Sequence, residues 1–134
     1  MKRASSGIPA LLLLALFLTA CAARSGEDVA AQPLSMFADV PLAPELSLDE
    51  KESHVYDHPI GQVGLLKASG AIQEKELLDF YRPALAANGW LPCGEFETGG
   101  GRLLVFGKPP RSLAIIIKEG WINSQVEINV SAKK

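Results

Sequence analysis

Cysteine is scarce in this chain, with two among 134 residues, so a small domain held together by several disulfides is excluded. Basic residues are not in excess, because 13 lysines and arginines face 15 acidic residues and give a net charge of −2. A nucleic-acid-binding domain carries a basic surface, and this composition argues against one. At this length, with 48% hydrophobic residues, the chain holds at most one globular domain.

A hydrophobic run long enough to span a bilayer is also missing from the sequence. The longest apolar stretch covers residues 8–18, or about 11 residues, whereas a spanning helix needs about 20. Lys2 and Arg3 precede this stretch, and small side chains follow it. This order is typical of a secretory signal peptide, which we expect to occupy residues 1–20.

The end of this leader carries a specific motif. Leu18-Thr19-Ala20-Cys21 resembles the lipobox of bacterial lipoproteins. The resemblance implies that signal peptidase recognises Leu18, Thr19 and Ala20, and that the Cys21 thiol bears diacylglycerol. It also implies that the new amino group is acylated, for example with palmitate, and that Ala22, in place of Asp, favours the outer membrane. Two or three acyl chains give stable anchoring, so we expect a membrane-attached protein of the cell envelope that faces the periplasm.

The chain after the leader divides into two parts. Residues 21–45 are rich in alanine, proline, serine and acids without a period, which predicts a lipidated flexible tether. Residues 46–132 are expected to form a single domain. Removal of the leader takes away Lys2 and Arg3 and no acidic residue, so the mature chain is more acidic than the full chain. An acidic protein is not attracted to an anionic lipid surface, so its membrane attachment must be covalent.

One amphipathic helix is expected at residues 74–88. Leu77, Tyr81 and Leu85 lie on one face of it, together with Phe80 and Ala84. Asn88-Gly89 should end the helix, with Gly89 in the left-handed conformation and Trp90 folded back on the last turn. Pro83 lacks a backbone N–H and predicts a kink.

Strands are expected wherever the apolar period falls to two, and these segments are residues 53–57, 62–68, 90–97, 102–107, 112–119 and 122–131. Short connections make neighbouring strands antiparallel. The order β-β-α-β-β-β-β predicts a two-layer α+β fold, with the helix packed on a mostly antiparallel sheet and the other sheet face open.

A second resemblance comes from the helix and the strand that follows it. Asp79-Phe80-Tyr81, Asn88-Gly89-Trp90 and residues 103–106 are similar to a group of small Gram-negative envelope lipoproteins of unassigned function. In that group a helix that ends on Asn-Gly-Trp leads into a meander of strands. The resemblance implies a fold and a location, and it assigns no catalytic residue.

The candidate metal ligands are few. His54 and His58, with Asp57 between them, would lie roughly 13 Å apart along a strand, whereas both nitrogens must approach an ion to about 2 Å. No phosphate-binding loop and no Gly-x-Ser-x-Gly motif occurs in the chain. We therefore expect no cofactor and no catalytic residue, although a small metal-dependent or hydrolytic enzyme that uses these three residues remains an alternative.

Three further side chains bear on function. Cys93 has no cationic neighbour in sequence, which favours a buried or half-buried inert thiol over intermolecular pairing or redox sensing. Trp121, beside Gly120 at a turn, and Tyr56 are the candidate binding aromatics. Together these features predict a non-catalytic envelope lipoprotein that binds another envelope component, protein or glycan, through the open sheet face or an edge strand. A structural or assembly factor is the other alternative.

Overall fold

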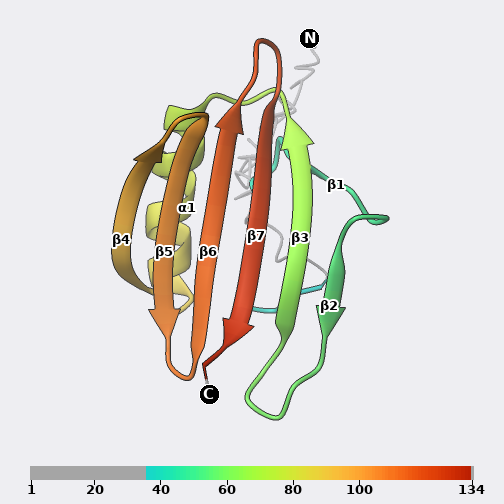
Figure 1. Ribbon diagram of the computed structural model, residues 1–134, viewed down its shortest axis with the longest axis vertical. Helices are drawn as coiled ribbons and strands as arrows, with labels where there is room; N and C mark the ends of the chain where they lie inside the picture. Colours follow the sequence, from blue (N-terminus) through green and yellow to red (C-terminus); the bar gives the residue numbers. More distant parts are fainter. Residues whose placement is uncertain (1–35, 134) are drawn as a thin grey trace, which may run out of the picture.

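The computed structural model describes residues 36–133, which form one helix and a seven-stranded sheet (Figure 1). The strands follow one another along the sheet in the order β1-β3-β7-β6-β5-β4, with β2 also paired to β3, and every pairing is antiparallel. The elements are β1 (Ser47–Leu48), β2 (His54–Tyr56), β3 (Val63–Gly70), α1 (Glu74–Ala87), β4 (Leu91–Thr98), β5 (Gly101–Lys108), β6 (Arg111–Glu119) and β7 (Ser124–Ala132).

The α+β class and the mostly antiparallel sheet expected from the sequence are confirmed. The expected element order needs one correction, because a further strand, β1, precedes the others. This strand has two residues, and its Ser47 and Leu48 pair with Ser69 and Ala68 of β3. A pair of residues is too short to show any period, so hydropathy patterning cannot reveal it.

Helix α1 ends as its sequence predicts. Gly89 takes a positive φ of 84°, its N–H donates to the Ala86 carbonyl, and the Trp90 N–H donates to the Leu85 carbonyl. These two bonds satisfy carbonyl groups that the end of a helix otherwise leaves unpaired. They also turn the chain back, so that the Trp90 side chain is fully buried. Pro83 is exposed, and the helix continues through it to Ala87.

The core lies between the sheet and a layer made of α1 and residues 36–46. Alternate side chains of the four long inner strands point into it, as the period of two requires. They are Leu66, Ala68, Leu104, Phe106, Leu113, Ile115, Ile117, Val126, Ile128 and Val130. The helix adds Leu77, Leu78, Tyr81 and Leu85. Figure 1 shows α1 behind β4 and β5, so this layer covers only one face of the sheet.

Residues 36–46, here called the N-terminal segment, pack into this core. Phe37 and Val40 are fully buried, and Ala43 and Leu46 are nearly so. The expected tether boundary at residue 45 is therefore wrong, because folded structure already includes residue 36. The buried side chains recur every three residues, an interval that matches neither the alternation of a strand nor the period of a helix. The expected signal peptide and the first part of the expected tether lie outside the described residues.

An ion cluster fixes the N-terminal segment at one end of the sheet. This Asp39 cluster consists of Asp39, Trp90, Lys108 and Arg111. The Trp90 indole N–H donates to the Asp39 carbonyl at 2.9 Å, and the Lys108 ammonium lies 2.7 Å from the Asp39 carboxylate. Arg111 pairs with the same carboxylate, and its guanidinium carbon lies 5.1 Å from the Trp90 ring centroid. Lys108 and Arg111 flank the turn between β5 and β6, so Asp39 holds the segment to that turn.

Candidate functional site

One face of the sheet, here called the open face, has no layer over it within residues 36–133. Its side chains are those that alternate with the core residues along each strand. Leu104 and Phe106 point into the core, whereas Ile116 lies on the open face. The open face is therefore an accessible surface on which side chains of several strands lie together.

The strand register places a row of five residues straight across the open face. Lys67 of β3 pairs with Glu127 of β7, which pairs with Ile116 of β6; Ile116 pairs with Leu103 of β5, and Leu103 pairs with Phe96 of β4. Side chains of directly opposed residues are about 4.5–5.5 Å apart at Cβ. The open face thus changes from charged at β3 to apolar at β4.

The apolar half of the open face is a patch of five side chains, here called the apolar patch: Phe96, Leu103, Val105, Ala114 and Ile116. Phe96 is 55% exposed and is the most accessible of them. A Cβ atom at Gly94 would come within 2.8 Å of the Phe96 ring, so the ring lies against the bare backbone of Gly94. Exposed contiguous apolar surface of this kind is typical of a contact site.

The sequence contains a signal for this patch. Residues 113–117 are all apolar, without the polar alternation of a half-exposed strand. Such a run is typical of a strand covered on both faces, or of a closely packed hairpin partner. In the structure Ala114 and Ile116 lie on the open face, which has no covering layer within the described part of the chain.

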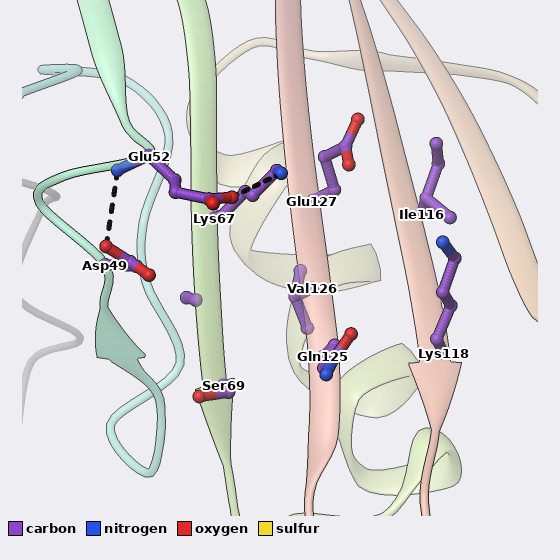
Figure 2. Close-up of a pocket in the computed structure, with 10 residues that line it drawn as sticks. Asp49, Glu52, Lys67, Ser69, Ile116, Lys118, Gln125, Val126 and Glu127 are labelled. Atoms are coloured by element: carbon purple, nitrogen blue, oxygen red, sulfur yellow. Dashed lines mark hydrogen bonds and ion pairs between the residues drawn. The ribbon is translucent and has the colours of Figure 1, made fainter.

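The charged half of the open face holds a shallow hollow of about 290 Å³, here called the polar hollow. Its lining groups are Asp49, Glu52, Lys67, Ala68, Ser69, Ile116, Lys118, Gln125, Val126 and Glu127. Figure 2 shows the Lys67 and Glu52 side chains pointing toward each other, with the ammonium 2.5 Å from the carboxylate. This hydrogen bond and the charge of Glu52 raise the pKa of Lys67 above its ordinary value. The hollow is lined by charges of both signs, by the Gln125 amide and by the Ser69 hydroxyl, so it suits a polar ligand surface that forms several hydrogen bonds with it.

The two aromatic residues predicted to bind lie far apart. Tyr56 is 64% exposed and pairs with Val63, at the start of β3. Trp121 is fully exposed in the turn between β6 and β7, next to the end of the sheet where Ser124 pairs with Gly70. Since Val63 and Gly70 are the two ends of β3, these aromatics cannot form a single site.

The candidate metal ligands are all on the surface. His54 lies in β2 opposite Leu65, and His58 lies in the following turn, where its Nδ1 accepts the Ile60 N–H at 3.4 Å. Asp57 between them is exposed. From residue 36 to residue 133, no group of three or more histidine, cysteine or acidic side chains could hold a metal ion. The structure does not gather these three residues into such a group.

Cys93 corrects another expectation, because its thiol is exposed rather than buried. The register of β4 against β5 shifts between Pro92 and Gly94, so Cys93 is the extra residue of a β-bulge in an edge strand. A bulged residue has no partner on the neighbouring strand. The expectation of a buried thiol rested on the sequence neighbours of Cys93, which do not reveal the bulge.

Leu18, Thr19, Ala20 and Cys21 lie outside the described residues, and the part of the chain that the structure describes contains no helix long and apolar enough to cross a bilayer. No family model, no curated protein and no solved structure gives a significant match to the chain. Function is therefore inferred from the residues and their geometry.

Proposed function

We propose that this protein is a non-catalytic lipoprotein of the bacterial cell envelope that binds another envelope component, protein or glycan, through its open face. Diacylglycerol on Cys21 holds it in the membrane, at the outer membrane and facing the periplasm. The observation that supports binding is the apolar patch beside the polar hollow, on a sheet face without a covering layer in the described chain. The lipobox-like sequence supports the anchor.

The open face suits a partner better than the edge of β4 does. A strand added to that edge would need an unbroken row of backbone donors and acceptors. Pro92 supplies no N–H, and the bulge at Cys93 breaks the pairing geometry. By contrast, the open face offers an exposed aromatic ring at Phe96 with polar groups next to it, which is the arrangement found at the centre and rim of protein interfaces.

The anchor is tested by feeding cells a labelled fatty acid and isolating the protein. We expect label in the wild type and none in Cys21→Ser, because the thiol is the site of the thioether. Cys93→Ser is the matched control, since it removes the chain's other cysteine and should keep the label. An unlabelled wild-type protein would end the lipoprotein proposal.

The binding face is tested by placing a photocrosslinking amino acid at single positions in living cells. Phe96 and Ile116 lie in the apolar patch, and Ala86 is an exposed position on α1 that serves as control. We expect one discrete adduct from each patch position and none from Ala86. Loss of the added mass on digestion with a glycan hydrolase identifies a glycan, and an added mass that survives this digestion identifies a protein. Equal adducts from all three positions, or none from the patch, would contradict the proposal.

The same adduct separates the proposal from the enzyme alternative. Changing His54 and His58 together to alanine alters no residue of the apolar patch, so the adduct at Ile116 is expected to persist. An adduct that disappears, or a bound metal ion that is lost with the two histidines, would favour the alternative.

A further inference from the structure

The turn between β6 and β7 carries two adjacent large apolar side chains in full contact with solvent. Trp121 is fully exposed and Ile122 is 84% exposed, the highest values among the large hydrophobic residues of the described chain. The Gly120 N–H donates to the Asn123 carbonyl at 3.0 Å and closes the turn between them. Figure 1 shows this turn projecting beyond the ends of the neighbouring strands. We call Trp121 and Ile122 the hairpin tip.

We propose that the hairpin tip inserts into the interfacial region of the bilayer to which Cys21 is anchored. This inference rests on the proposed lipid anchor. Tryptophan is enriched at membrane interfaces, where its ring contacts acyl chains and its N–H stays among polar groups. A convex tip with two apolar side chains fits a deformable lipid surface without a preformed pocket. The anchor also keeps that surface permanently close, so a weak contact is sufficient.

The length of the chain between the anchor and the folded part permits this contact. The N-terminal segment meets the sheet at the β5–β6 end, where the Ala38 N–H donates to the Gln62 side chain and Asp39 pairs with Lys108. The hairpin tip is at the opposite end, about 30 Å away along strands of nine residues. The chain from Cys21 to Met36 can extend to about 50 Å, which exceeds that distance.

The charges near the tip indicate an apolar contact rather than an electrostatic one. Lys118 and Glu119 precede the turn with one charge of each sign, and the chain as a whole is acidic. An acidic protein gains nothing from an anionic lipid surface. The contact is therefore expected to form on zwitterionic lipid and to be insensitive to salt.

The two tryptophans make the test specific. Trp121 is at the tip and Trp90, the other tryptophan of the chain, is fully buried. The lipidated protein is reconstituted into phosphatidylcholine vesicles with and without brominated acyl chains, which quench only indoles that touch them. We expect the bromine to remove about half of the total emission, since one of two indoles reaches the interface.

Three variants assign the quenching. Trp121→Phe leaves only Trp90, and its emission should be the same with and without bromine. Ile122→Ser should weaken the quenching, whereas Phe96→Ser, a matched change on the open face, should leave it unchanged. High salt should also leave it unchanged. Unquenched emission from the lipidated wild type would overturn the inference.

Failure of the anchor is distinguished by the mass of the purified protein. If Cys21 carries no lipid, the proposed function fails, and the tip is then tested on the full chain with Cys93→Ser, coupled through Cys21 to a maleimide lipid in the same vesicles. Quenching in this form supports insertion of the tip, and its absence overturns it.

Discussion

Replacing Asp39 with asparagine removes one negative charge from a site where two cations converge. Lys108 and Arg111 both pair with the Asp39 carboxylate, and the Asp39 backbone carbonyl accepts the Trp90 indole N–H. The substitution keeps the backbone and the side-chain size. It therefore leaves the Trp90 bond in place and tests the charge alone.

The expected loss of stability follows from the exposure of the cluster. Breaking a fully buried ion pair costs about 3–5 kcal/mol, and breaking an exposed one costs about 0–1 kcal/mol. The Asp39 and Arg111 side chains are 19% and 11% exposed, so we expect about 2 kcal/mol. A domain of this size has about 5–15 kcal/mol of stability in total. The melting temperature should fall by about 10 °C.

Thermal and urea unfolding followed by circular dichroism measure this loss. Asp79→Asn is the matched control, because Asp79 pairs with Lys75 on the exposed surface of α1 and no measurable change is expected there. Equal melting temperatures of Asp39→Asn and Asp79→Asn would refute the reasoning.

The pH dependence gives an independent check. Burial alone would raise the pKa of Asp39, but hydrogen bonds from Arg111 and Lys108, with their charges, outweigh it and lower the pKa below its ordinary 3.8. Because the folded state holds this carboxylate in its charged form, its contribution is present above about pH 4 and disappears as the pH falls through the lowered pKa. The difference in the free energy of unfolding between the wild type and Asp39→Asn should become smaller in acid. A difference that does not change with pH would contradict a lowered pKa of Asp39.

Three further predictions concern single side chains. The Tyr81 hydroxyl is buried near the Ala43 backbone but makes no hydrogen bond of ordinary geometry in the described chain. Tyr81→Phe should therefore leave the free energy of unfolding unchanged or raise it by up to about 1 kcal/mol, and a clear loss in urea unfolding would show that the hydroxyl is bonded. A Cβ atom at Gly70 would lie 2.1 Å from the Glu45 carbonyl, so Gly70→Ala should cost about 2 kcal/mol, whereas Gly99→Ala, in open space, should be neutral in the same assay. Cys93 is exposed and should react with a thiol reagent in the native protein; a reaction that waits for global unfolding would disprove this.

Regular periods made the secondary structure predictable from the sequence. The helix and the six longer strands have observed ends within two residues of those expected. The end of α1 was also predictable in detail, since Gly89 alone among the neighbouring residues adopts a positive φ without strain and Trp90 then returns to the core. These features depend on residues close together in the sequence.

Contacts between distant residues were not predictable in the same way. Asp39 is separated from Lys108 by 69 residues, and no local pattern links them. The burial of Phe37 and Val40 depends on a surface that exists only after the sheet has formed. The exposure of Cys93 depends on a β-bulge, which shifts the register of the strand. A bulge has no hydrophobic period of its own by which the sequence would reveal it. The candidate site shows the same division. The turn beside Gly120 suggested an exposed Trp121, whereas its separation from Tyr56 follows from the register of β3.

The route of the N-terminal segment determines how the fold responds to a mechanical load. The segment crosses from the Asp39 cluster at the β5–β6 turn to Glu45, whose carbonyl lies against Gly70 at the far end of β3. Tension on the chain ahead of Met36 reaches the Asp39 ion pairs before it reaches any strand. The segment would then detach residue by residue, with Phe37 leaving first, before the hydrogen-bonded ladder of the sheet is pulled apart.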